Sequence, residues 1–226
     1  MTKLVNNINI RLMPRRQVYF RVGEYYHIFN HSVGEMPIFK GARECTFFLE
    51  AMRFYLQLKP QTKFSIFRNS PNSFPYTLEN KVVSIIDYCL MPNHFHLTLR
   101  QETEDGIVHF IQKLSSSFAH YYSIKYKKRG HVFEDKFKSV HLENTEQLLH
   151  LSRYIHLNPV TAYIVQRPED YPYSSYNAFI GLSEVDFIDT LPILENFPSV
   201  QKYKEFVTDQ IDYQKVLDRI KHLIFE

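Results

Sequence analysis

Cysteine is scarce in this sequence of 226 residues, which contains only Cys45 and Cys89. Both lie in apolar-rich segments without the spacing of a metal or disulfide motif, so we expect two buried free thiols. Long apolar runs are missing too, because none approaches the roughly 20 residues that a membrane-spanning helix needs. The N-terminal stretch lacks the apolar core of a secretory signal. We therefore expect a cytoplasmic protein with no membrane partner.

Net charge is also small, at +3, and by itself it indicates no class of partner. Hydrophobic residues make up 44% and charged residues 23% of the chain, which is the balance of a folded globular protein. The stretch KYKKRGH gathers four cations, namely Lys125, Lys127, Lys128 and Arg129. Such a cluster can follow a phosphate backbone, although most short basic runs are solvated faces.

The first half of the chain is predicted to contain both strands and a helix. A Tyr, Phe, Val and Ile-rich strand is predicted over residues 17–30, and helical spacing predicts a helix within 41–60 that Pro60 stops. Residues 62–67 suggest a short strand. Two β-rich runs, 81–90 and 94–100, are separated by Met-Pro-Asn and predict an antiparallel hairpin.

The second half of the chain is predicted to be mainly helical. The predicted helices cover residues 105–126, 144–159, 200–210 and 212–225. Asn144 is expected to cap the second of these helices, and Pro159 is expected to end it. We therefore expect an α+β fold with an antiparallel sheet and helices packed on it. Residues 1–180 would form the main domain and residues 181–226 a helical C-terminal extension.

The hairpin carries a pair of histidines in HFHLTLR. Side chains alternate across a strand, so His94 and His96 share one face while Phe95, Leu97 and Leu99 share the other. The two imidazoles are about 7 Å apart at the backbone, from a rise near 3.3 Å per residue, and can converge on one divalent ion. Two ligands are too few for a stable site. The pair is therefore either two exposed histidines or part of a metal site completed from elsewhere.

The helix before Pro159 offers such a complement. His150, Tyr154 and Asn158 lie at successive spacings of four and share a helix face. The amide oxygen of Asn158 can bind a metal. Tyr154 offers a phenol, whose reference pKa of about 10 makes it a poor nucleophile without help. A cation held against a phosphodiester stabilises the transition state of attack as a Lewis acid. Against this, most of the 16 tyrosines must be structural.

Five stretches resemble a known family. YCLMPNHFHLTLR is similar to the hairpin and the His-hydrophobic-His motif of the single-tyrosine HUH transposases, the transposase IS200-like family. RYIHLNPVTAYIV resembles the nucleophile helix of their REP-associated tyrosine transposase branch. YYHIFNHS, GHVFEDKFKS and YPYSSY resemble the first strand of that branch and the segments on either side of its tyrosine helix. The similarity covers most of the chain from Tyr25 to Tyr176.

The resemblance implies a ferredoxin-like antiparallel sheet with helices and a specific set of roles. Tyr154 would be the nucleophile, and His94, His96 and Asn158 would bind a catalytic magnesium or manganese ion. The enzyme would cleave single-stranded DNA, at hairpin-forming sequences, to leave a 5′-phosphotyrosine and a free 3′-hydroxyl, and would rejoin strands by the reverse attack. The cationic cluster at 125–129 would contact this DNA. We expect a monomer, with a dimer as the alternative.

Two other functions stay open at this stage. One is a DNA-binding regulator that descends from such a transposase and no longer catalyses cleavage. The other is a metal-dependent phosphohydrolase in which water replaces tyrosine as the nucleophile. A covalent protein-DNA intermediate distinguishes the transposase chemistry from both.

Overall fold

The computed structural model describes residues 19–70, 78–134 and 136–211. Its centre is a four-stranded antiparallel sheet with the strand order β2-β3-β1-β4. The strands are β1 (Tyr25–His31), β2 (Val83–Met91), β3 (His94–Gln101) and β4 (Lys138–Leu142). With α1 (Ala42–Tyr55) following β1 and α3 (Gly106–Tyr126) following β3, the chain has the β-α-β-β-α-β order of a ferredoxin-like fold.

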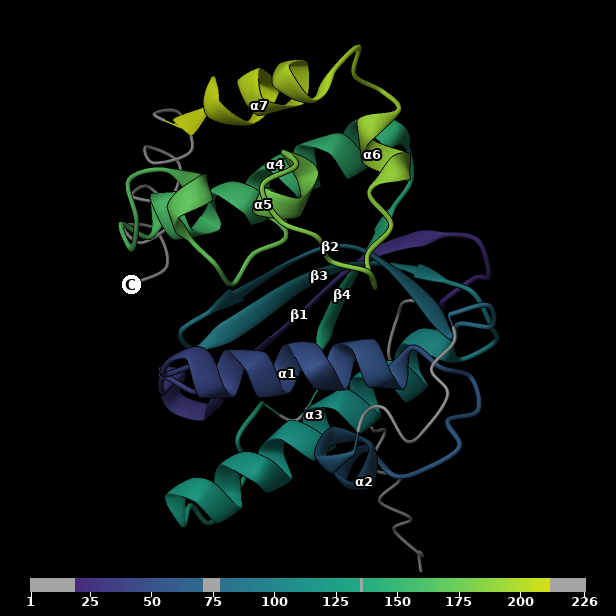
Figure 1. The fold of residues 1–226 in the computed structure, drawn as a ribbon, viewed down its shortest axis with the longest axis vertical. Coiled ribbons are helices and arrows are strands. Elements are labelled where there is room, and N and C mark those ends of the chain that lie inside the picture. The colour runs from purple at the N-terminus through teal and green to yellow at the C-terminus, as the bar shows by residue number, and fades with distance from the viewer. Residues whose placement is uncertain (1–18, 71–77, 135, 212–226) are drawn as a thin grey trace, which may run out of the picture.

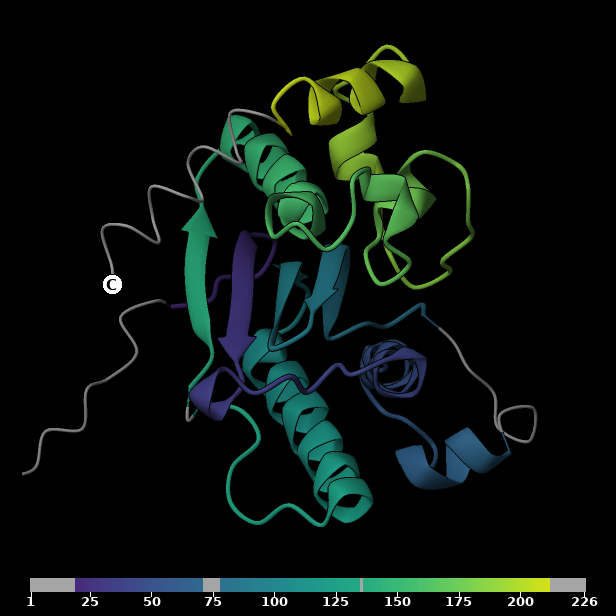
Figure 2. The same ribbon diagram turned by 90° about the vertical axis from the view of Figure 1, so that its left-hand side faces the viewer.

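Helices cover both faces of this sheet (Figures 1 and 2). One face carries α1, α2 (Phe64–Asn69) and α3, and the other carries α4 (Thr145–Thr161) and the short elements that follow it. These are the 3-10 helix η3 (Pro168–Asp170), α5 (Tyr176–Phe179), α6 (Leu191–Leu194) and α7 (Val200–Thr208). A further 3-10 helix, η1 (Val33–Glu35), follows β1.

The hairpin divides its side chains between the two layers as the alternation predicts. Phe95, Leu97 and Leu99 of β3 are fully buried in the core shared with α1 and α3. Their neighbours on β3 therefore face the α4 layer, because side chains alternate along a strand. Both cysteines are buried and free, as expected. Within the described residues, no helix has the length and apolar character needed to cross a membrane.

Helix α4 begins where the sequence predicts and ends later. Asn144 caps it, because its side chain accepts a hydrogen bond from the backbone N–H of Gln147 at 2.9 Å. The expected end at Pro159 is wrong, since the helix continues to Thr161. Pro159 removes one backbone donor. The last turn is nevertheless closed at the carbonyl of Asn158, which accepts from the backbone N–H of Ala162 and from the hydroxyl of Thr161, both at 3.0 Å.

Three other expectations need correction or lie outside the description. The short strand expected at 62–67 is wrong, because this segment lies in α2, where Phe64 and Phe67 at helical spacing pack against Phe47 and Phe54 of α1. The first strand starts at Tyr25 rather than in the run from 17, and β4 was not expected at all. The helix expected over 212–225 lies outside the described residues.

Candidate active site

An open cavity of about 660 Å³ lies on the α4 side of the sheet. Its walls come from β1, the β2–β3 hairpin and α4. His94, His96, Tyr154 and Asn158 all line it. The structure thus brings together, in one chain, the two segments that the sequence analysis singled out.

The two hairpin histidines are held through the same ring atom. The Nδ1 of His94 lies 2.6 Å from the Oδ1 of Asn93, and the Nδ1 of His96 lies 2.9 Å from the Nε2 of His27. Since a carbonyl oxygen accepts, His94 donates from Nδ1 and its Nε2 carries the lone pair. When His96 donates to His27, its Nε2 carries a lone pair as well. Metal-binding histidines typically have one ring nitrogen fixed by such a neighbour.

Strand β1 adds two histidines that the sequence analysis did not assign. His27 and His31 line the same cavity, and the ring of His31 stacks on His94 with centroids 4.7 Å apart. The register pairs His31 with His94 and Phe29 with His96 across the two strands. The alternation in HIFNH places both histidines on one face, which is a visible signal. Only the pairing of β1 with β3 shows that the side chains of His27 and His31 lie on the same face of the sheet as those of His94 and His96.

Burial keeps several of these rings neutral. It lowers the pKa of His27 to about 4, and burial together with the neighbouring His31 lowers the pKa of His94 to about 4. The pKa of His31 is lowered as well, first by burial. Neutral imidazole is the form that binds a metal, so protons compete little for His94 at neutral pH.

Helix α4 supplies the other two predicted residues. The ring of Tyr154 meets that of His96 edge to face, with centroids 5.6 Å apart. Asn158 is 8% exposed, and within the described residues its Nδ2 has no hydrogen-bond partner. A buried N–H donor without an acceptor is costly and is expected where a ligand with an acceptor oxygen would complete it. The third residue on the predicted face, His150, lies outside the cavity, where it contacts Arg153 and Glu146.

The residues at the cavity fit a divalent cation in their chemistry. Among the described residues, no three His, Cys, Asp or Glu side chains form a metal-binding group, so the amide of Asn158 is needed beside His94 and His96. Both imidazoles have Nδ1 held by a neighbour, and Asn158 brings to the same cavity an amide oxygen, which is a ligand for hard cations. Two imidazoles and one carboxamide would leave positions on a magnesium or manganese ion for water or phosphate oxygens.

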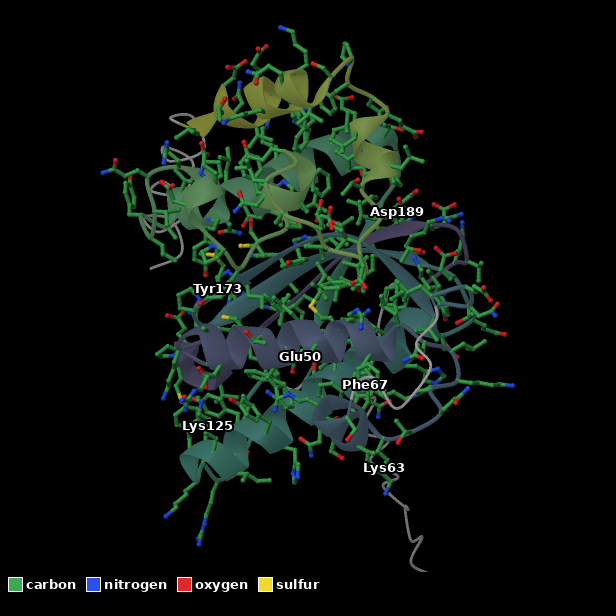
Figure 3. All side chains as sticks on the ribbon, in the orientation of Figure 1. Glu50, Lys63, Phe67, Lys125, Tyr173 and Asp189 are labelled. Atoms are coloured by element: carbon green, nitrogen blue, oxygen red, sulfur yellow. The ribbon has the colours of Figure 1, made fainter. Side chains whose placement is uncertain are left out.

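The basic cluster lies at the far end of α3, away from these residues. None of Lys125, Lys127, Lys128 and Arg129 lines the cavity. Lys125 forms an ion pair with the buried Glu44 of α1, and Figure 3 places it in the helix layer on the opposite side of the sheet from α4. Lys128 comes nearer, because its Nζ is 3.6 Å from the Sδ of Met36, whose neighbours line the cavity. Lys127 and Arg129 are exposed.

Comparisons with known proteins agree with this description. Residues 68–158 match the model of the family described as Transposase IS200 like, which is the family that the sequence resembles. The matched segment contains His94, His96, Tyr154 and Asn158. No curated protein matches the chain significantly.

One solved structure supports the fold. It is described as "Structure of the REP associates tyrosine transposase bound to a REP hairpin". The match has a TM-score of 0.54 at 14% sequence identity, and it covers 78% of this chain and 98% of that chain. At this identity the likeness concerns the fold, and the expected α+β fold of an antiparallel sheet with packed helices is confirmed.

Proposed function

We propose, from the match of residues 68–158 to the IS200-like transposases, that this protein cleaves and rejoins single-stranded DNA through a covalent bond to Tyr154. The observation that carries the proposal is the shared cavity. Tyr154 and Asn158 from α4 line the same space as His94 and His96 from β3. Because all four residues come from one chain, a single copy is sufficient, and we assign the chemistry to residues 1–180.

The chemistry assigns a different task to each side chain. The phenol oxygen of Tyr154 attacks the phosphorus of a phosphodiester, and the bond from phosphorus to the 3′ oxygen breaks. The phenol proton is replaced by phosphorus, and a proton from the surrounding water completes the leaving 3′-hydroxyl. The product is a 5′-phosphotyrosine, whose attack by a 3′-hydroxyl restores the DNA and the phenol. His94, His96 and Asn158 would hold a magnesium or manganese ion, which as a Lewis acid supplies charge stabilisation at the phosphate.

Single-stranded DNA with hairpin-forming sequence is the substrate we propose. The solved structure of similar fold is described as bound to a REP hairpin, and this motivates the same class of DNA here. The exposed cations Lys127 and Arg129 can contact its phosphates. A phosphotyrosine intermediate requires the strand to reach Tyr154, which an open cavity on the surface permits.

The test is formation of a covalent adduct. The full chain is incubated with a labelled hairpin oligonucleotide that carries single-stranded flanks, in the presence of manganese, and then denatured before electrophoresis. Tyr154→Phe removes only the nucleophilic oxygen and is expected to abolish the adduct. Tyr163→Phe, on an exposed tyrosine just beyond the same helix, is the matched control and is expected to retain it.

Each other result identifies a different function. An adduct that persists with Tyr154→Phe would remove this residue from the mechanism. Binding of DNA without an adduct under several metals would indicate a non-catalytic regulator. Repeated cleavage without any adduct would indicate a phosphohydrolase that uses water.

A further inference from the structure

The side of α4 that faces away from the cavity carries a buried hydrogen-bond network. His156 is fully buried, and both of its ring nitrogens have partners. Its Nδ1 lies 2.6 Å from the hydroxyl of Tyr203, and its Nε2 lies 2.8 Å from the hydroxyl of Ser175. The imidazole therefore cannot turn without breaking both bonds.

Tyr203 connects this network to α7. Its hydroxyl lies 3.0 Å from that of Ser152 as well as against His156, so one phenol bridges two residues a turn apart on α4. The ring is fully buried in the apolar cluster between α4 and α7, with the ring of Phe179 at 5.3 Å. The C-terminal extension thus holds α4 by a polar contact as well as an apolar one.

Ser175 connects the same network to the sheet. Its hydroxyl accepts from the backbone N–H of Tyr88 at 2.9 Å and lies 3.2 Å from the carbonyl of that residue. The hydrogen bonds therefore run from β2 through Ser175 and His156 to Tyr203. Burial lowers the pKa of His156 to about 3 and raises that of Tyr203 well above its usual range. Both groups stay neutral, so each keeps the proton arrangement that the network needs.

The position of these contacts around the helix axis affects the residues that line the cavity. Successive residues of an α-helix are turned by about 100°, so His156 is about 200° away from Tyr154. A restraint on His156 and Ser152 sets the rotation of the helix about its axis. That rotation decides whether the phenol of Tyr154 and the amide of Asn158 face His96.

We propose that Tyr203 and His156 are positioning residues, which fix the rotation of α4 so that Tyr154 is presented to the phosphodiester. This inference rests on the proposed function of Tyr154. It gives the C-terminal extension a part in the reaction although, within the described residues, none of its side chains lines the cavity.

The experiment compares two variants of α7 in the full chain. Tyr203→Phe removes the hydroxyl and keeps the ring, whereas Val207→Ala removes buried apolar contacts of the same helix and leaves the network in place. Two quantities are measured well below the melting temperature of each variant. They are amide hydrogen exchange across residues 152–158 and the single-turnover rate of adduct formation at saturating DNA.

Tyr203→Phe is expected to raise the rate of amide exchange in this segment by about tenfold. It is also expected to lower the rate of adduct formation by about tenfold with unchanged DNA affinity, because a small misplacement of reacting groups raises the barrier. Val207→Ala is expected to stay within about twofold of the wild type in rate, since it alters no polar contact of α4. Unchanged exchange or an unchanged rate with Tyr203→Phe would overturn the proposal, and so would an equal loss of rate with Val207→Ala.

The two arms separate this inference from the proposed function. If the wild type forms no adduct, the proposed function fails, and the exchange measurement still decides whether Tyr203 restrains α4. If the wild type forms the adduct and Tyr203→Phe does so at the same rate, the proposed function stands and the positioning role fails.

Discussion

The two sides of α4 differ in how completely their polar groups are paired. On the side away from the cavity, His156 uses both ring nitrogens and Ser152 has the hydroxyl of Tyr203. On the cavity side, Asn158 is nearly as buried, yet its Nδ2 has no partner among the described residues. One helix therefore carries both a completed hydrogen-bond network and an incomplete one.

Structural and functional polar residues of this fold can be distinguished by how completely they are hydrogen-bonded. A buried polar group with all its bonds made stabilises the native state, and its partners explain why it is there. A buried polar group with an unmet bond is costly unless a ligand completes it. His94 and His96 line the same cavity as Asn158, and each has its Nδ1 held by a neighbouring side chain.

Substitution of His94 is expected to slow the reaction most. Replacement by Ala removes one proposed metal ligand, and the single-turnover rate of adduct formation is expected to fall by about a thousandfold, because Lewis-acid stabilisation is worth several kcal/mol. His120→Ala, an exposed histidine on α3, is the matched control and is expected to keep the rate within about twofold. Equal losses of rate in the two variants would show that the loss does not depend on the position of His94 at the cavity.

Asp87 faces the side of α4 on which the polar groups are otherwise paired, and its unpaired carboxyl gives a second prediction. This carboxyl on β2 is fully buried beside Thr98 and Ser152, but neither of its oxygens has a hydrogen bond of good geometry within the described residues. Burial raises its pKa from 3.8 to about 6, so the folded state binds more protons between these values. The stability from this group is fully present below about pH 3.8 and is lost as the pH rises through 6.

Asp87→Asn removes that dependence. Its free energy of unfolding is expected to exceed that of the wild type by about 2–3 kcal/mol at pH 8, because one pKa unit corresponds to about 1.4 kcal/mol. The difference is expected to shrink below about 1 kcal/mol near pH 4. Urea unfolding at the two pH values measures it. A variant that is less stable than the wild type at pH 8 would mean that the ionised carboxylate is paired after all.

A third prediction compares the two sides of α4 directly through stability. Ser152→Ala takes a partner from the buried hydroxyl of Tyr203 and is expected to cost about 1 kcal/mol. Asn158→Ala removes an amide whose nitrogen is already unpaired and is expected to cost less than about 0.5 kcal/mol in the absence of DNA and metal. Urea unfolding of both variants at one pH is sufficient. The reverse order would show that the amide of Asn158 is structural.

Local patterns in the sequence predicted much of the fold. The hairpin, the amphipathic α3 and the Asn144 cap depend on alternation, on spacing and on a side chain that bonds its own backbone, all of which can be read within one segment. The errors arose where distant contacts decide. Helix α2 forms because two phenylalanines pack on α1, and β4 is a short edge strand paired to β1 with few apolar residues.

The residues that line the candidate site were visible in the sequence only in part. The histidine motif and the tyrosine helix were each visible, and the resemblance to a family joined them. The contribution of His27 was not, because its contact with His96 depends on the pairing of β1 with β3. The role proposed for Tyr203 depends likewise on a contact across 47 positions with His156, which no local pattern encodes.

The smallest expected effects concern the basic cluster, where the same comparison of paired and unpaired groups applies to charges. Lys125 is paired with Glu44, and this ion pair raises its pKa. Lys127 and Arg129 are exposed at the end of α3. Lys127→Gln and Arg129→Gln are each expected to weaken hairpin DNA binding by less than about 1 kcal/mol and to reduce the slope of log affinity against log salt by about 1, because each phosphate contact releases roughly one counterion.

Lys125→Gln is expected to leave that slope unchanged, since the ammonium already has an acidic partner. Fluorescence anisotropy at several salt concentrations measures all three slopes, and a slope change that is largest for Lys125→Gln would mean that DNA replaces Glu44 as its partner.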